Sequence, residues 1–278
     1  MSERGLVDAM VAVSARLAAD NAVPALSFRG VTFSYGQVPL LRGLDLDVPA
    51  GCVTGVLGPN GCGKSTLLKL ADGLVRAQAG MVLAGGRDVS TMPARERARM
   101  VALLPQVHRT PSMTVRDLVM CGRYARMGAF GRAGAEDRAA VDEALRELDL
   151  TALAGKPARR LSGGERQRAF LAMVLAQGAR TLLLDEPTTY LDVSAAHETM
   201  ALARRLNREC GVTVVAVIHD INLALRMCDR IVVLDGRAVR AAGAPTDPVV
   251  LSAIEGVFGI DVVPVETPHG RAYATFPR

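Results

Sequence analysis

A glycine-rich stretch near residue 60 constrains the fold more than any other part of the chain. Residues 58–66 read GPNGCGKST and follow a short apolar run, Val53 to Leu57. The stretch matches G-x-x-x-x-G-K-[ST], a pattern whose glycines let backbone N–H groups surround phosphate oxygens. It needs a buried strand before the loop and a helix after it, and a helix from Ser65 toward Leu74 would direct its positive end at the phosphates. The sequence therefore predicts a nucleoside triphosphate site on a strand–loop–helix unit.

Different residues of this loop are expected to bind different parts of the nucleotide and its metal ion. Lys64 would place a point charge at the β and γ phosphates, and the Ser65 hydroxyl can ligate Mg²⁺. Cys62 lies at a helix N-terminus beside Lys64, and both features lower a thiol pKa, so we expect either a reactive thiol or an inert small residue that fills the loop. The residues expected to bind nucleotide in the loop are Gly58, Pro59, Asn60, Gly61, Cys62, Gly63, Lys64, Ser65 and Thr66.

A second motif supplies carboxylates. Residues 181–187 read TLLLDEP, an apolar strand that ends in two adjacent acids. A buried strand beside the loop would deliver Asp185 to the Mg²⁺ site. Glu186 comes one residue later, where a carboxylate can polarise the attacking water as a general base. An acidic turn after a strand is common on its own, but behind a phosphate loop it favours a hydrolytic site.

A third motif raises the question of how many chains build the site. Residues 161–168 read LSGGERQR, and Ser162, Gly163 and Gly164 precede a helix that we expect to run through Met173. This is a second helix start suited to phosphate. One chain does not need two such starts for a single γ-phosphate. We therefore expect two chains to pair head to tail, each giving this helix start to the nucleotide of the other.

These motifs, in this order, resemble the ATP-binding subunits of ABC transporters, and the resemblance covers residues 25 to about 240. LSGGERQR is similar to the signature of that family and lies just before the DEP strand, as it does there. Tyr35 resembles the aromatic residue that stacks on adenine. Gln106 resembles the Q-loop glutamine, which implies a Mg²⁺ ligand beside Ser65 and Asp185.

The same resemblance extends to the last part of the site. Tyr190-Leu191-Asp192 resembles the D-loop, and His219, after the apolar run Val212 to Ile218, resembles the switch histidine that contacts the γ-phosphate. The resemblance implies ATP and Mg²⁺ as cofactors, and the residues that it implies to be catalytic are Glu186, His219 and Lys64. One departure is that the D-loop begins Thr189-Tyr190, where many members have Ser-Ala.

Alternating strands and helices predict a largely parallel sheet. The expected strands are Leu26–Phe33, Leu40–Val48, Val53–Leu57, Val101–Leu104, Thr181–Leu184 and Val212–Ile218, and the expected helices include Pro93–Met100 and Glu136–Leu150. The resemblance implies an α/β fold of the P-loop NTPase class: an ABC cassette with a RecA-like core, an antiparallel β subdomain and a helical subdomain. We expect an ATPase domain over residues 25–245, with the helical subdomain at about 107–170, and a short tail over 246–278.

Residues 1–24 are Ala-rich and form an expected extension outside the cassette, either frayed or docked. Leu6, Met10, Val13 and Leu17 could form one face of a short helix there. The apolar stretch Leu6 to Val13 is interrupted by Asp8, so it does not predict a signal peptide.

Composition limits the function classes. No apolar run reaches the roughly 18 residues that a membrane span needs, so a membrane role would have to come through a partner. The five cysteines form no CxxC pair, which is typical of reduced thiols in a cytosolic protein. The net charge of +5 comes from scattered arginines and aromatic residues are only 4%, which argues against nucleic acid as the main partner.

The resemblance also implies partners and a place in the cell. It implies a homodimer of ATPase subunits joined to transmembrane permease subunits, with a substrate-binding protein as an indirect partner and no nucleic acid. The chain would lie at the cytoplasmic face of the inner membrane, held there by the permease.

Three segments resemble the importer branch for iron complexes, haem and cobalamin: Thr114–Leu118, Gly122–Tyr124 and Glu186–Asp192. We therefore expect an ATPase subunit that powers uptake of a metal chelate, with an iron–siderophore or haem favoured. We also expect Arg123 and Tyr124 to lie near the permease-docking surface. The alternatives are an ABC ATPase subunit for another substrate (cobalamin, a metal ion or an exported compound) and a soluble ABC ATPase without a transport role.

Overall fold

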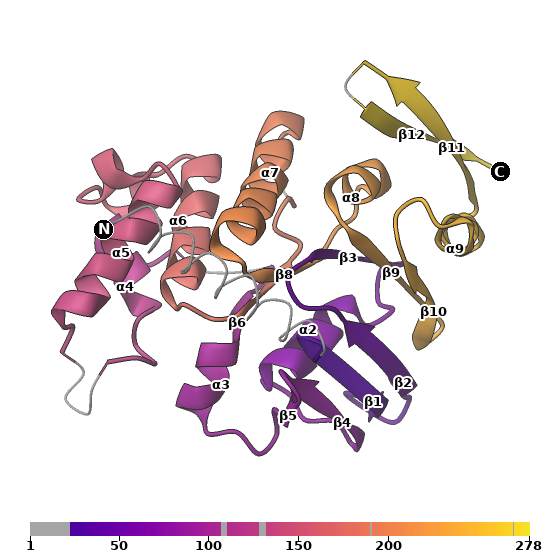
Figure 1. The fold of residues 1–278 in the computed structure, drawn as a ribbon, viewed down its shortest axis with the longest axis horizontal. Helices are drawn as coiled ribbons and strands as arrows, with labels where there is room; N and C mark the ends of the chain where they lie inside the picture. Colours follow the sequence, from indigo (N-terminus) through magenta and orange to yellow (C-terminus); the bar gives the residue numbers. More distant parts are fainter. Residues whose placement is uncertain (1–22, 107–109, 128–131, 190, 269) are drawn as a thin grey trace, which may run out of the picture.

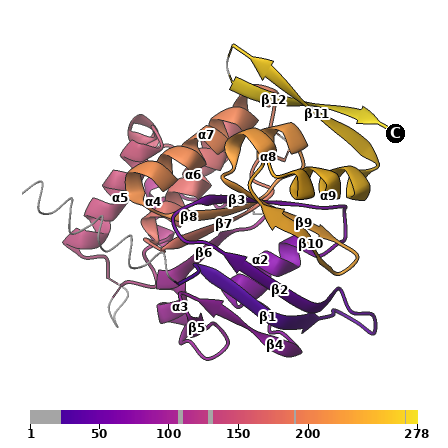
Figure 2. The same cartoon turned by 45° about the vertical axis from the view of Figure 1, so that its right-hand side comes forward.

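The computed structural model describes residues 23–106, 110–127, 132–189, 191–268 and 270–278. The expected helix over Leu6 to Leu17 lies outside these residues. Within them, a central six-stranded sheet is covered by an antiparallel sheet on one side and by a layer of helices on the other (Figure 1, Figure 2). This arrangement confirms the predicted α/β cassette with its antiparallel and helical subdomains.

The central sheet has the strand order β10–β9–β3–β8–β7–β6. Its strands are β3 (Val53–Leu57), β6 (Val101–Leu104), β7 (Thr181–Asp185), β8 (Thr213–Val217), β9 (Arg230–Asp235) and β10 (Ala238–Gly243). Every neighbouring pair is parallel except β9 with β10. All five residues of β3, β7 and β8 are buried, as expected where both faces of a parallel sheet are covered. The carboxyl ends of these parallel strands therefore share one edge of the sheet.

The antiparallel sheet packs on the helix that follows the glycine loop. It consists of β1 (Leu26–Phe33), β2 (Leu41–Val48), β4 (Ala79–Ala84) and β5 (Arg87–Asp88). The helix α2 (Lys64–Asp72) buries Leu67, Leu68 and Leu70 in the core shared by this sheet and the central sheet. The predicted start of the second strand at Leu40 is one residue early, and β4 and β5 were not predicted.

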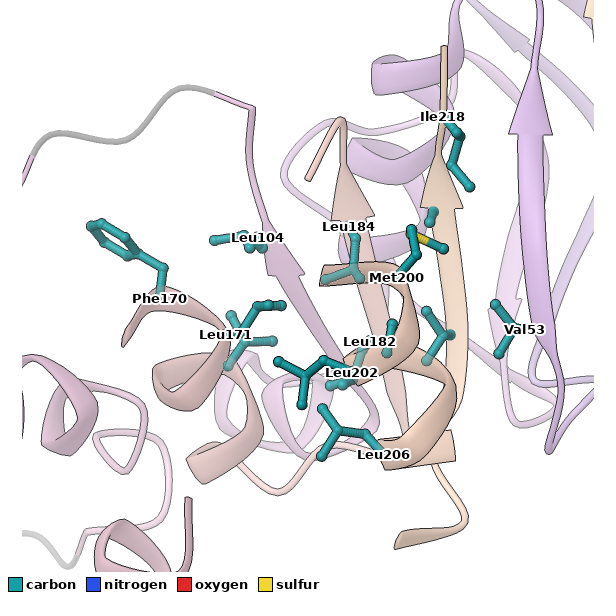
Figure 3. Packing of buried hydrophobic residues seen from close by; sticks show 14 of the residues in the cluster. Val53, Leu104, Phe170, Leu171, Leu182, Leu184, Met200, Leu202, Leu206 and Ile218 are labelled. Carbon is teal, nitrogen blue, oxygen red and sulfur yellow. The ribbon is translucent and has the colours of Figure 1, made fainter. Parts of the chain in front are cut away.

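The helical layer contains α3 (Ala94–Met100), α4 (Val115–Cys121), α5 (Ala135–Glu147), α6 (Gly163–Ala176) and α7 (Val193–Cys210), with 3₁₀ turns at Thr151–Leu153 and Ala158–Arg160. The predicted apolar face of Val141, Leu145 and Leu148 is fully buried. Side chains from α6 and α7 pack over β7. Figure 3 labels Phe170, Leu171, Met200, Leu202 and Leu206 on the two helices and Leu182 and Leu184 on the strand. This packing fixes α6 against the sheet.

The last part of the chain is more ordered than the predicted short tail. After α8 (Ile221–Met227), residues 246–278 form α9 (Pro248–Phe258) and a hairpin of β11 (Ile260–Thr267) with β12 (Gly270–Pro277). Tyr273 is buried, and its backbone N–H donates to the Asn222 side chain at 3.0 Å. The hairpin is thereby held on α8. The predicted domain boundary at 245 stays a prediction.

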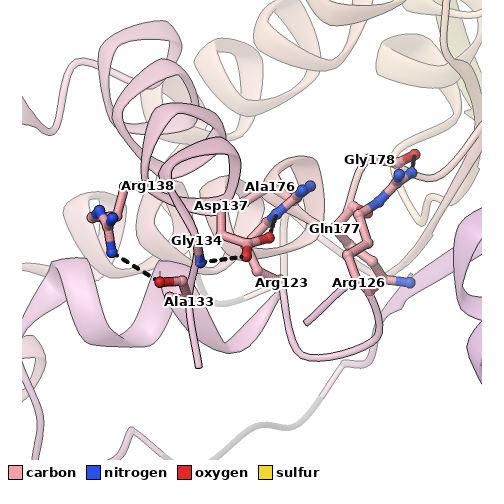
Figure 4. Close-up of polar contacts among 9 residues, drawn as sticks. All are labelled: Arg123, Arg126, Ala133, Gly134, Asp137, Arg138, Ala176, Gln177 and Gly178. Carbon is pink, nitrogen blue, oxygen red and sulfur yellow. Dashed lines mark hydrogen bonds and ion pairs between the residues drawn. The ribbon is translucent and has the colours of Figure 1, made fainter. Parts of the chain in front are cut away.

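A buried arginine ties the helical subdomain together (Figure 4). Arg123, which follows α4, is 5% exposed, and its guanidinium donates to Asp137 at the start of α5 (3.0 Å) and to the Ala176 carbonyl at the end of α6 (2.8 Å). The N–H of Gly134 donates to the other Asp137 oxygen at 2.9 Å and, with Arg123, keeps the pKa of that carboxyl below its usual range. Arg123 is therefore buried and cannot itself contact a partner, whereas Tyr124 beside it is 72% exposed, and the expectation that this segment lies near a docking surface stays a prediction.

Two contacts close to Arg123 also hold α6 in place. A Cβ at Gly122 would lie 2.0 Å from the Met173 carbonyl oxygen, so only glycine lets the end of α4 approach α6 this closely. The Gln177 amide donates to the carbonyls of Ala98 and Val101 at 2.7 and 3.0 Å. The carboxyl end of α6 is thus fixed to the start of β6.

We predict that Arg123→Ala destabilises the helical subdomain by about 3–5 kcal/mol, because it leaves the Asp137 carboxylate buried without its partner. The matched control is Arg116→Ala, which breaks the exposed Arg116–Asp142 pair and should cost at most about 1 kcal/mol. Urea denaturation, with hydrogen exchange of α5 and α6, measures the difference. Equal losses in the two variants would contradict the assigned role of Arg123.

Candidate functional site

The glycine loop leaves the carboxyl end of β3 and closes tightly onto α2. Gly63 precedes the helix at φ 108°, a left-handed conformation that favours glycine. A Cβ at Gly58 would lie 2.4 Å from the Leu234 carbonyl oxygen and 2.7 Å from the Cys62 sulfur. The strand–loop–helix unit predicted from the sequence is therefore present, and α2 begins at Lys64, one residue before the predicted start.

The Lys64 ammonium is held inside this loop. It donates to the carbonyls of Gly58 (2.7 Å) and Pro59 (2.8 Å), and the residue is only 5% exposed. A buried ammonium surrounded by dipoles gains from a nearby anion, since removal of a full charge from water is costly. The loop is therefore suited to hold phosphate groups against Lys64.

Oxygen donors from two elements meet beside the loop. The Ser65 hydroxyl donates to an Asp185 carboxylate oxygen at 2.8 Å, and Asp185 is 4% exposed at the end of β7. Burial raises the pKa of Asp185, and the negative charge of Glu186 adds to the rise, whereas Ser65, Lys69 and Lys64 oppose it. The hydroxyl and the carboxylate can supply two oxygen ligands to Mg²⁺. The remaining ligands of such an ion are typically phosphate oxygens and water.

Glu186 is held by groups from three other segments. One carboxylate oxygen accepts from the Gln106 amide (2.6 Å) and the Thr189 hydroxyl (3.0 Å), and the other lies 2.7 Å from His219 Nε2. Glu186 itself adopts φ 53°, a left-handed conformation that is uncommon for a residue with a side chain. The carboxylate is therefore fixed in place beside Asp185, with one lone pair or more left to accept a proton from water.

Two further predicted residues, Tyr35 and Gln106, lie at the rim of the site. The Tyr35 ring is 65% exposed, makes an edge-on contact with Phe33, and has its hydroxyl 3.5 Å from Thr66 Oγ1 at the first turn of α2. An exposed ring at this point can stack on a base. Gln106 lies within the site, but its amide nitrogen donates to the Glu186 carboxylate, and its role as a metal ligand stays a prediction.

The surroundings of Cys62 bear on the two alternatives left open by the sequence. Burial raises the pKa of this thiol, and the opposing effect of Lys64 is smaller. The sulfur lies against Gly58 inside the loop. The alternative from the sequence, a small residue that fills the loop, is therefore favoured.

The third motif caps a helix and does not join the loop. The Ser162 hydroxyl accepts from the Glu165 N–H at 3.3 Å, and the Ser162 N–H donates to the Glu165 carboxylate at 2.7 Å. Ser162 and Gly163 are exposed, and α6 packs on α4, α5, α7 and β6. Asp192 likewise caps α7, where it accepts from the Ala195 N–H at 2.8 Å. Tyr190 lies outside the described residues.

Comparison with known proteins agrees with this geometry. The model of the ABC transporter family matches residues 41–189. The chain belongs to the ABC transporter family. It is 40% identical over 245 residues, covering 88% of this chain and 91% of the other, to the Iron(3+)-hydroxamate import ATP-binding protein FhuC of Bacillus subtilis (strain 168). It is also 40% identical over 244 residues, covering 86% and 94%, to the Hemin import ATP-binding protein HmuV of Pseudomonas putida (strain KT2440).

Solved structures match the fold over most of the chain. An inward-facing transporter assigned to the metal-chelate type of ABC transporters superposes with a TM-score of 0.79 at 26% identity, covering 92% of this chain and 97% of the other. A dimeric ATP-binding cassette bound to ADP and Pi superposes with a TM-score of 0.69 at 28% identity, covering 80% and 99%. The chain is thus an ATP-binding ABC ATPase subunit. Among the described residues, no helix is both long and apolar enough to span a bilayer.

The contact between Thr189 and Glu186 was not predicted from the sequence. We predict that Thr189→Val lowers kcat about tenfold with little change in the KM for ATP, because it removes one hydrogen bond to a charged group. Thr189→Ser keeps the hydroxyl and should retain most of the wild-type rate. Steady-state ATPase assays distinguish the two, and a similar loss in both variants would show that the methyl group matters rather than the hydrogen bond.

Proposed function

We propose that this chain is the ATP-hydrolysing subunit of an importer of a metal chelate, and that the chelate is an iron–siderophore or haem. The observation that carries hydrolysis is the convergence of Lys64, Ser65, Asp185 and Glu186 at one edge of the sheet. The substrate class rests on the relatives, whose names specify import of iron hydroxamates and hemin at 40% identity.

In this proposal each side chain has one role toward ATP. The loop N–H groups and Lys64 hold the phosphates, and the Tyr35 ring stacks on adenine. Ser65 and Asp185 would hold Mg²⁺ with the phosphates, and Gln106 would reach it from the side. When bound, the ion neutralises phosphate charge. Glu186 accepts a proton from the attacking water, and His219 holds Glu186 in place and contacts the γ-phosphate.

A complete site takes two chains. The exposed start of α6 presents Ser162, Gly163 and Gly164 away from the chain's own loop. The Ser162 N–H is taken by Glu165, so the N–H groups of Gly163 and Gly164 and the Ser162 hydroxyl would bind the γ-phosphate of ATP on a partner. Asp192 belongs to the same dimer face. The dimeric cassette bound to ADP and Pi supports a pair of this kind.

The remaining partners would attach at the helical subdomain. Transmembrane permease subunits would dock there, and the exposed Tyr124 is suited to that contact whereas the buried Arg123 is not. A substrate-binding protein would act indirectly through the permease, and nucleic acid has no part. In this proposal the chain lies at the cytoplasmic face of the inner membrane, held there by the permease.

We predict that Ser162→Arg blocks ATP-driven pairing while a single chain still binds ATP, because a bulky side chain cannot fit against the γ-phosphate of the partner. The test uses the Glu186→Gln background, which should hydrolyse ATP about 10²–10⁴ times more slowly and so hold the closed pair. Light scattering with ATP should report a dimer for Glu186→Gln and a monomer for the double variant. An ATP-dependent dimer of the double variant would refute the two-chain site.

We predict that a strain lacking this gene loses uptake of one iron–siderophore or haem and regains it with the wild-type gene but not with Glu186→Gln. Iron chelates, haem and cobalamin are supplied as separate sole sources, and uptake of each labelled compound is measured. Normal uptake of the iron chelates and haem, together with loss of another nutrient, would contradict the substrate class and leave the ATPase assignment intact.

A further inference from the structure

The helix α8 begins directly after His219 and depends on its neighbours for its position. Asp220 caps it: the carboxylate accepts from the Leu223 N–H and the carbonyl from the Ala224 N–H, both at 2.9 Å. A helix of only seven residues is not stable in water by itself and is held by packing. Contacts that fix the first turn of α8 therefore also fix the backbone at His219.

The helix lies between the core and the C-terminal hairpin (Figure 1, Figure 2). Its buried residues are Leu223, Ala224 and Leu225, and it packs on β3 and α7. Toward the hairpin, the amide oxygen of Asn222 accepts from the Tyr273 N–H on β12 at 3.0 Å. Asn222 is the second residue of α8, so this contact acts on the turn that Asp220 caps.

The ladder of the hairpin makes the Tyr273 N–H available for this contact. Tyr273 lies opposite Pro264 on β11. Proline is tolerated in a strand where its nitrogen points away from the partner strand, and the opposite residue of such an antiparallel pair also points its N–H outward. Tyr273 is only 6% exposed, so its outward N–H needs an acceptor from another element. Asn222 supplies that acceptor.

The hairpin has a second attachment that does not involve α8. The Val262 N–H on β11 donates to the Glu255 carboxylate of α9 at 2.9 Å. The Arg278 guanidinium donates to Asp261 at 2.7 Å and to Glu255 at 3.2 Å. Since α9 packs on β9 and β10 of the central sheet, the hairpin is fixed to the core independently of α8. It can therefore act as a brace on that helix.

The contact between His219 and Glu186 is sensitive to small movements of α8. His219 Nε2 lies 2.7 Å from a Glu186 carboxylate oxygen. A separation of about 3.6 Å is no longer a hydrogen bond, so a shift of about 1 Å is enough to break the pair. The His219 side chain is 43% exposed, so packing around the ring holds it less firmly than its backbone does.

We propose that Asn222 is a positioning residue for ATP hydrolysis. With the Tyr273 N–H it braces the first turn of α8 and thereby keeps His219 within hydrogen-bond distance of Glu186. The inference rests on the roles proposed above for Glu186 and His219. It gives the C-terminal hairpin a function in the reaction, although the site residues described above all lie outside it.

The first test compares Asn222→Ala with Asn222→Asp in steady-state ATPase assays. Alanine removes the acceptor and is a good helix former, whereas aspartate keeps a carboxylate oxygen that can accept from Tyr273. We expect Asn222→Ala to lower kcat about tenfold and to change the KM for ATP less than about twofold, because the shift affects the groups around the attacking water and not the loop around Lys64. Asn222→Asp should retain at least about half of the wild-type kcat.

A control variant lies in the hairpin itself. Glu266→Ala breaks the exposed pair of Glu266 with Arg271 and leaves the contact with Asn222 in place. Its kcat should stay within about twofold of the wild-type value.

A double-mutant cycle with His219→Ala separates positioning from a general effect on the fold. The rates are measured in single turnovers with the protein in excess over ATP. If Asn222 acts through His219, Asn222→Ala lowers the rate about tenfold in the wild-type background but less than about twofold when residue 219 is already alanine.

Three outcomes would overturn the inference. If His219→Ala is slow but Asn222→Ala matches the wild type, the brace is refuted and the proposed function stands. A tenfold loss that persists in the His219→Ala background would show that Asn222 acts by another route. A wild-type rate for His219→Ala would refute the role proposed for the histidine and this inference with it.

Discussion

The parallel pairing of β3, β6, β7 and β8 is the constraint on which the rest of the site depends. Because these strands run in one direction, the residues that follow them emerge at one edge of the sheet, although they come from four distant parts of the chain. Lys64, Gln106 and His219 each follow a different one of these strands, and Asp185 is the last residue of β7. Pairing of the strands thus brings the site residues close together. Hydrogen bonds between side chains, such as that of Ser65 with Asp185, then fix their final positions.

The sequence predicted those parts of the fold in which local pattern and burial agree. Val53–Leu57 and Val101–Leu104 were predicted with the observed ends, because parallel strands that are buried at all or most of their positions are largely apolar runs. The strand β4 was missed since it begins with exposed residues and contains Gly80. The hairpin β11–β12 was missed because Pro264 interrupts its alternation, and its main anchor is a contact with Asn222 on a distant helix.

The surroundings of single residues were also missed where they depend on tertiary contacts. Arg123 looks like a surface residue in the sequence, and only the fold brings Asp137 and the end of α6 around its guanidinium. Cys62 lies at a helix start beside a lysine, which locally favours the thiolate, but burial in the loop has the larger effect on its pKa. Thr189 shows its role only once the turn after β7 places its hydroxyl on Glu186. Motif order could identify the site residues, whereas their partners depend on tertiary contacts.

The attachment of α6 has a mechanical consequence. Gln177, at its carboxyl end, is fixed by two hydrogen bonds to the core, and Arg123 holds the neighbouring Ala176 carbonyl, while Ser162 at the other end is exposed. The helix is therefore held at its carboxyl end, which can serve as a pivot, and its exposed start is the end that we propose to face a partner chain. A helix of 14 residues is about 21 Å long, so a rotation of about 10° about the pivot moves the exposed start by roughly 4 Å. A displacement of that size makes or breaks hydrogen bonds to a phosphate, with the glycine loop unchanged.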